Sequence, residues 1–132
     1  MANEYAENTT LRSPLGRVRG LGSAKGGTHH WWMQRVTSMA LLPLMLWFAL
    51  SAASLAGASY AETVAWIGRP WNAVLLLATI ALAFHHTAAG IQVILEDYAN
   101  QEWVKMGGIL AIKAICWLLA LASALAVLRI AV

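Results

Sequence analysis

Three long runs of apolar residues dominate the chain, separated by short polar stretches. No Lys, Arg, Asp or Glu occurs in residues 36–61 or 70–95, and Lys113 is the only one in residues 106–128. Each run exceeds the roughly 20 residues that a helix needs to cross a hydrocarbon layer about 30 Å thick. The pattern therefore predicts an all-α membrane protein with three transmembrane helices. We expect these helices at about residues 32–56, 70–96 and 106–130.

The polar stretch before the first run divides the chain in two. We expect residues 1–30 to form a tail outside the membrane and residues 31–132 to form a three-helix anchor domain. A signal peptide does not fit, because the first apolar run follows about thirty hydrophilic residues and is about twice as long as a signal sequence requires. Composition agrees with a membrane protein: 60% of the residues are hydrophobic and 11% are charged, against about 25% charged in a typical soluble domain.

Basic residues are concentrated before the first run. The tail contains Arg12, Arg17, Arg19 and Lys25. Because segments rich in Lys and Arg stay on the cytoplasmic side, we expect a cytoplasmic N-terminus and a cytoplasmic loop around residues 96–106. The C-terminus should then face the other side. The net charge of +3 is explained by topology and lipid contact, and no motif indicates a nucleic-acid partner.

Two adjacent histidines lie inside the second run. A histidine at membrane depth is costly without a partner, so it is a functional candidate. On a helix, His85 and His86 point about 100° apart, and only His86 lies on nearly the same face as Asp97. Gly90 lowers the surface beside His86, so a flat group such as a porphyrin could lie there. The pattern favours His86 as a haem ligand, although small residues also favour plain helix packing, and either imidazole could simply bond a neighbouring helix.

An acidic residue and a tyrosine end the second run. A phenol can donate a hydrogen bond to a quinone carbonyl, and a carboxylate can relay protons from water. Asp97 and Tyr98 are therefore candidates for a quinone site, and about 18 Å of helix between His86 and Tyr98 leaves room for a haem as well. The alternative is a solvated helix end with an interfacial tyrosine.

A second polar group lies at the start of the first run. His29 and Arg35 flank the paired tryptophans Trp31 and Trp32. Such residues commonly extend to the lipid headgroups. Arg35 could also pair with an anionic group such as a haem propionate through charge-assisted hydrogen bonds.

Two motifs together resemble the small hydrophobic membrane-anchor subunit of bacterial succinate dehydrogenase, the enzyme of respiratory complex II. The pattern G-x-H-x(5)-R-x-T is formed by Gly27, His29, Arg35 and Thr37. The pattern H-x(3)-G-x(6)-D-Y is formed by His86, Gly90, Asp97 and Tyr98. Their order, at matching ends of consecutive spans, is more specific than either pattern alone. His85 and the long tail are departures that the resemblance does not explain.

The resemblance implies a haem b shared with a second anchor subunit of the cytochrome b type. His86 would be one axial ligand of the haem iron, and the companion subunit would supply the other histidine. Tyr98 would hydrogen-bond ubiquinone with Asp97 close by, while His29 and Arg35 would lie near the haem propionates. The chain would be a multi-pass protein of the bacterial inner membrane.

The resemblance also implies a division of labour within the complex. Succinate would be oxidised at FAD in a flavoprotein subunit, and electrons would reach ubiquinone through clusters in an iron–sulfur subunit. This chain has no flavin motif, and its lone Cys116 cannot hold a cluster that needs several thiolates, so we expect no catalysis by this chain alone. The alternatives are an anchor of fumarate reductase, or a non-redox membrane scaffold or transport component.

Overall fold

The computed structural model describes residue 15 and residues 27–132. Four helices follow one another in the second of these ranges: α2 (Gly27–Ser54), α3 (Tyr60–Ile67), α4 (Pro70–Tyr98) and α5 (Glu102–Ala131). All except α3 are long and apolar enough to cross a membrane. The predicted all-α membrane fold with three spans is therefore confirmed. The basic residues predicted to orient the tail, Arg12, Arg17, Arg19 and Lys25, lie outside the described residues.

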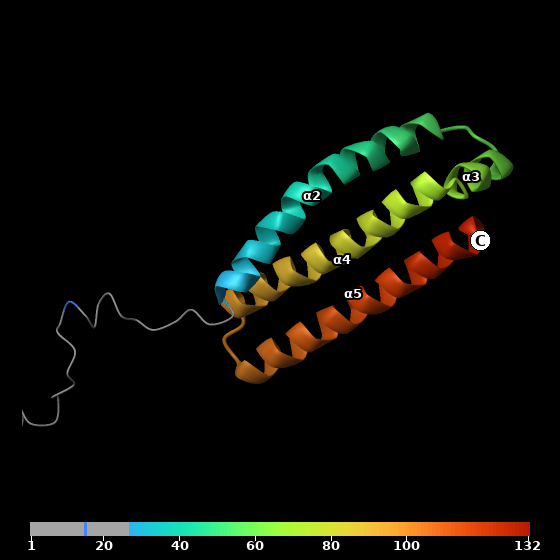
Figure 1. Cartoon of the computed structure of the whole chain (residues 1–132). Helices are drawn as coiled ribbons and strands as arrows, with labels where there is room; N and C mark the ends of the chain where they lie inside the picture. Colours follow the sequence, from blue (N-terminus) through green and yellow to red (C-terminus); the bar gives the residue numbers. More distant parts are fainter. Residues whose placement is uncertain (1–14, 16–26) are drawn as a thin grey trace, which may run out of the picture.

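The three long helices run side by side, with α4 in the middle (Figure 1). Helix α4 packs closely against both α2 and α5, whereas the backbones of α2 and α5 do not approach each other closely. The start of α2, the end of α4 and the start of α5 lie at one end of the bundle, and the C-terminus lies at the other (Figure 1). Helix α2 bows away from α4 along its middle, and this arc contains Pro43, whose ring removes one helical hydrogen bond.

The short helix α3 was not predicted; the sequence led us to expect a plain loop between the first two spans. Ser59 caps α3 by accepting a hydrogen bond from the backbone N–H of Glu62, and the Glu62 carboxylate accepts one from the backbone N–H of Ser59. This capping box satisfies two otherwise free donors. Trp66 of α3 then stacks on Trp47 of α2, with ring centroids 5.7 Å apart. Gly57, at φ +84°, provides the left-handed turn that leads into α3.

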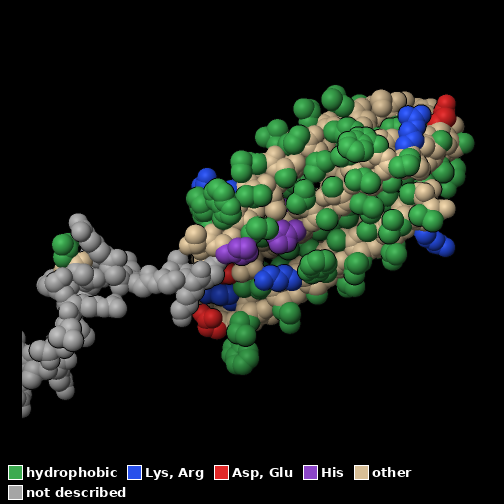
Figure 2. Space-filling model, viewed as in Figure 1, with side chains coloured by type: hydrophobic (Ala, Val, Ile, Leu, Met, Phe, Trp, Pro, Cys, Tyr) green, Lys and Arg blue, Asp and Glu red, His purple; other side chains and the backbone are tan. Residues whose placement is uncertain are grey.

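The bundle has almost no interior of its own. Its buried residues are mostly small: Thr37, Ala73, Leu76, Thr79, Ala88, Ala89 and Cys116. Large apolar side chains instead cover the outside of the helices, as Figure 2 shows for one face. A soluble protein does not expose this much apolar surface. These surfaces therefore face lipid or another membrane subunit.

Candidate functional site

His86 is held between α4 and α2 by a buried threonine. Its Nδ1 atom lies 3.0 Å from Oγ1 of Thr37, whose side chain belongs to a residue only 2% exposed. The Thr37 hydroxyl also lies 2.8 Å from the carbonyl oxygen of Met33, to which it donates. With its proton directed to Met33, the hydroxyl can accept from a protonated Nδ1 of His86. That tautomer leaves a lone pair on Nε2, which forms no hydrogen bond with any described residue.

Gly90 leaves space beside His86, as the sequence suggested, but the side chain of Gln34 in α2 lies in that space. A Cβ atom at Gly90 would lie 3.3 Å from Nε2 of Gln34. The Oε1 atom of Gln34 is buried and has no hydrogen-bond partner in the part of the chain that the structure describes. An unpaired buried amide oxygen is costly. It therefore marks this contact between α2 and α4 as a place where a further polar group would be favourable.

Two stripes of residues run along the second half of α4. His86, Gly90, Val93 and Asp97 follow the spacing of one helix face, which we call the His86 stripe; His85, Ala89, Gln92 and Glu96 form the neighbouring His85 stripe. The stripes lie about 100° apart around the helix. The His85 stripe lines the larger cavity, whereas the smaller cavity is lined by Val93 of one stripe and Glu96 of the other.

The smaller cavity, of about 530 Å³, lies where the start of α2 meets the end of α4. Arg35 and Trp31 line it, with the Arg35 guanidinium 4.2 Å from the centre of the Trp31 ring. Arg35 forms no ion pair with any described residue, so its charge is free to meet an anionic group. His29 does not line this cavity but the larger one, whereas His30 lines both. The sequence placed His29 and Arg35 in one site and assigned no role to the adjacent His30.

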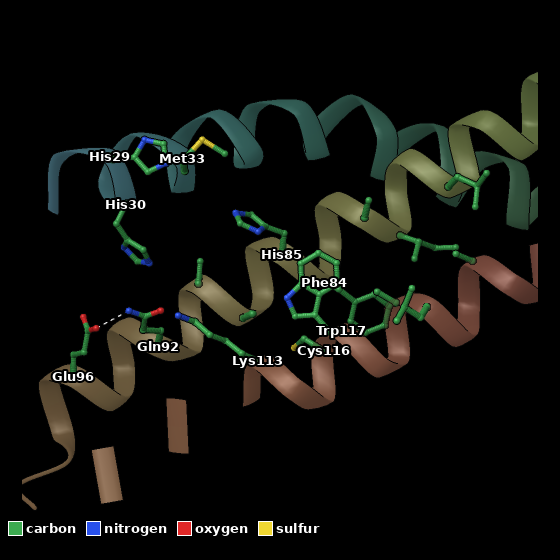
Figure 3. A pocket seen from close by; sticks show the side chains of 18 of the residues that line it. His29, His30, Met33, Phe84, His85, Gln92, Glu96, Lys113, Cys116 and Trp117 are labelled. Atoms are coloured by element: carbon green, nitrogen blue, oxygen red, sulfur yellow. Dashed lines mark hydrogen bonds between the residues drawn. The ribbon is translucent and has the colours of Figure 1, made fainter. Parts of the chain in front are cut away.

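The larger cavity, of about 870 Å³, lies between α2, α4 and α5. Figure 3 shows His85 and Lys113 projecting into it, with Phe84 and Trp117 farther along. His85 is exposed and forms no hydrogen bond with any described residue. His86 does not line this cavity. The two adjacent histidines therefore have different neighbours: His86 contacts Thr37 of α2, and His85 lines the larger cavity.

The candidate quinone residues lie at the end of α4, outside both cavities. Tyr98 is 81% exposed, and Asp97 is also exposed. Neither side chain forms a hydrogen bond with any described residue. The described part of the chain therefore does not enclose these two side chains.

Comparison with known proteins identifies the family. Residues 9–123 match the model of the succinate dehydrogenase/fumarate reductase transmembrane subunit. The chain belongs to this family. A succinate dehydrogenase hydrophobic membrane anchor subunit from Rickettsia bellii is 32% identical over 107 residues, covering 78% of this chain and 82% of the relative. One from Rickettsia typhi is 30% identical over 118 residues, covering 89% and 94%.

A third succinate dehydrogenase anchor subunit, from Paracoccus denitrificans, is 31% identical over 86 residues, covering 65% of this chain and 67% of the relative. No solved structure gives a significant match. The resemblance inferred from the two motifs is confirmed at the level of family. The chain is a membrane anchor subunit of succinate dehydrogenase, and it therefore works in a membrane together with other subunits of that complex.

Proposed function

We propose that this anchor subunit provides half of a haem b site and one wall of a ubiquinone-reduction site in a succinate:ubiquinone oxidoreductase. The observation that supports this most is the contact between His86 and Thr37. Iron-bound histidines usually use their second ring nitrogen to bond an oxygen acceptor, which fixes the tautomer and the ring orientation. The Nδ1 atom of His86 has such an acceptor, so Nε2 can serve as the axial ligand.

The charge near His86 suits a haem. Arg35, at the same end of the bundle and without an acidic partner among the described residues, would pair with a propionate, with His29 nearby in α2. The second histidine ligand would come from a cytochrome b anchor subunit packed beside α2 and α4. A haem held this way supplies a one-electron acceptor whose potential depends on both axial ligands.

Tyr98 would orient the quinone by donating a hydrogen bond from its phenol to a quinone carbonyl. Asp97 would pass protons from water, because it is exposed at the end of α4 where the helix leaves the membrane. Partner subunits would complete the pocket, since both side chains are exposed in the described part of this chain. FAD and the iron–sulfur clusters would belong to the flavoprotein and iron–sulfur subunits.

The topology follows from the basic tail. We place the N-terminus and the α4–α5 connection on the cytoplasmic side of a bacterial inner membrane. Tyr98 and Arg35 then lie on the side where peripheral subunits can deliver electrons. Succinate oxidation is favoured over fumarate reduction because the relatives reported above are named as succinate dehydrogenase subunits.

A reduced-minus-oxidised visible spectrum of the purified complex tests the proposal. We expect the bands of a b-type haem in a stoichiometry of one per copy of this subunit. A complex that reduces ubiquinone but contains no haem would remove the cofactor part of the proposal. A complex with neither property would favour the non-redox scaffold.

A further inference from the structure

The proposed haem ligand and quinone residues lie outside the larger cavity; of the residues assigned to those two sites, only His29 lines it. The cavity borders the His85 stripe, and His86 and Tyr98 do not line it. Its volume of about 870 Å³ lies within the range of roughly 300–1,000 Å³ that is typical of small-molecule sites. The residues that line it restrict which ligand it would suit.

The lining is polar at one end and apolar at the other. Glu96 and His30 line the end where α2 begins and α4 ends, and Phe84 and Trp117 line the middle (Figure 3). Leu121 of α5 belongs to the lining farther along. A ligand that fills this cavity must therefore have a polar head near the membrane surface and an apolar tail that reaches into the membrane.

Lys113 is the strongest indication of the headgroup's charge. It is the only charged residue in residues 106–128 and lies about 16 Å along α5 from its first residue. Its ammonium forms no ion pair or hydrogen bond with any described residue; the one lysine ion pair there is between Lys105 and Glu102. A cation at this depth needs an anionic partner. In Figure 3, the Lys113 side chain points toward Gln92, at the polar end of the cavity.

Two further groups at this end would complete a headgroup site. The Nε2 atom of His30 is buried without a hydrogen-bond partner in the described part of the chain. The Oε1 atom of Glu96 accepts a hydrogen bond of 2.7 Å from Gln92, which holds the carboxylate in place and leaves its other oxygen available. The polar end therefore offers donors for an anion beside an acceptor for a cation.

We propose that this cavity binds one phospholipid of the phosphatidylethanolamine type. Lys113 and His30 would hold the phosphate, Glu96 would accept from the headgroup ammonium, and an acyl chain would lie along Phe84 and Trp117. A neutral quinone would leave Lys113 without a counterion. A purely anionic headgroup would leave Glu96 facing a negative charge.

The test measures which lipid the assembled complex retains. The purified complex is stripped with detergent, mixed with vesicles of equal phosphatidylethanolamine and phosphatidylglycerol, repurified and analysed by native mass spectrometry. We expect one tightly held phosphatidylethanolamine per copy of this subunit. Lys113→Gln should reduce its retention by about tenfold or more, the scale of one lost charge-assisted hydrogen bond. Lys113→Arg should retain it.

Three further variants separate the lipid from other occupants. Glu96→Gln should lower retention of phosphatidylethanolamine and raise the share of phosphatidylglycerol. Ala81→Phe keeps every charge but narrows the apolar part of the cavity, which Ala81 lines, and should also lose the lipid. Lys105→Gln, outside the cavity, should change nothing. The haem spectrum should stay unchanged in all of these variants.

The proposal is overturned if the wild-type complex retains no lipid at this site, or if Lys113→Gln and Ala81→Phe both retain as much as wild type. Retention of phosphatidylglycerol in preference to phosphatidylethanolamine would also overturn it. Loss of haem in Lys113→Gln would assign the cavity to the cofactor instead.

Discussion

Replacing Thr37 with valine should weaken haem binding and raise the haem potential. Valine has nearly the same shape as threonine, so it keeps the packing of a residue that is 2% exposed. It removes the hydroxyl 3.0 Å from Nδ1 of His86 and leaves that N–H without an acceptor. A buried donor left unpaired costs about 1–3 kcal/mol, and loss of such an outer partner typically lowers metal affinity by about 10- to 100-fold.

The shift in potential has a definite sign. A hydrogen bond from Nδ1–H makes the imidazole a stronger electron donor, which stabilises ferric iron more than ferrous iron. Losing this hydrogen bond should therefore raise the midpoint potential. If the hydrogen bond stabilises the ferric form by about 0.5–1.5 kcal/mol more than the ferrous form, the rise is about 20–60 mV for a one-electron couple. Haem content and an optical redox titration of the assembled complex measure the two effects.

Two matched variants control this experiment. Thr37→Ser keeps the hydroxyl and should behave nearly as wild type. Ser38→Ala removes a neighbouring hydroxyl that bonds only the carbonyl of Gln34 among the described residues, so haem content and potential should not change. If Thr37→Val matches wild type in both measurements, or if Ser38→Ala shifts them equally, Thr37 does not support an iron ligand.

Four other predictions concern three separate parts of the chain. Tyr98→Phe should lower the rate of quinone reduction by about 5- to 150-fold, from the loss of one hydrogen bond worth about 1–3 kcal/mol, and should leave the haem content intact. As a control, Tyr60 is an exposed tyrosine in α3, and Tyr60→Phe should not change the rate. Equal activity of the two variants would reduce Tyr98 to an interfacial anchor. A reporter fused after Val132 should be active only outside the cytoplasm, and cytoplasmic activity would reverse the topology. Ser59→Ala should speed hydrogen exchange in α3 about fivefold, for a cap worth about 1 kcal/mol. Hydrogen bonds from the Ser59 backbone and side chain lower the pKa of Glu62 in the folded state. The ionised Glu62 carboxylate therefore stabilises α3 above its unfolded-state pKa, and this stabilisation is lost as pH falls through the lower folded-state pKa. Hydrogen exchange in wild-type α3 that does not become faster in acid would contradict this prediction.

The spans could be predicted from sequence because each depends on a local property, an apolar run with at most one charged residue that is long enough to cross the membrane. Helix α3 was missed although the Ser59-x-x-Glu62 spacing of a capping box was present, because its 8 residues are too few for sequence periodicity to separate a short helix from a loop. Helix α2 begins at Gly27, several residues before the apolar run itself, because a helix can extend past the hydrophobic pattern that reveals it.

The site was predictable only as far as helix geometry allowed. Spacing along α4 separated His86 from His85, and the structure gives each of them different neighbours. The contact of Thr37 with His86 joins residues far apart in the sequence, so it depends on how α2 packs against α4 and not on spacing within either helix. Lys113 was visible as a lone charge, but only the packing of three helices shows that it lines a cavity.

The most direct measurement compares two alanine variants of the adjacent histidines in the assembled complex. Low-temperature electron paramagnetic resonance and the reduced-minus-oxidised spectrum report whether the haem has two histidine ligands. We expect His86→Ala to lose the six-coordinate low-spin signal, through loss of the cofactor or an empty axial position, and His85→Ala to keep it. A low-spin haem that survives His86→Ala and disappears in His85→Ala would contradict the account and place the haem in the larger cavity.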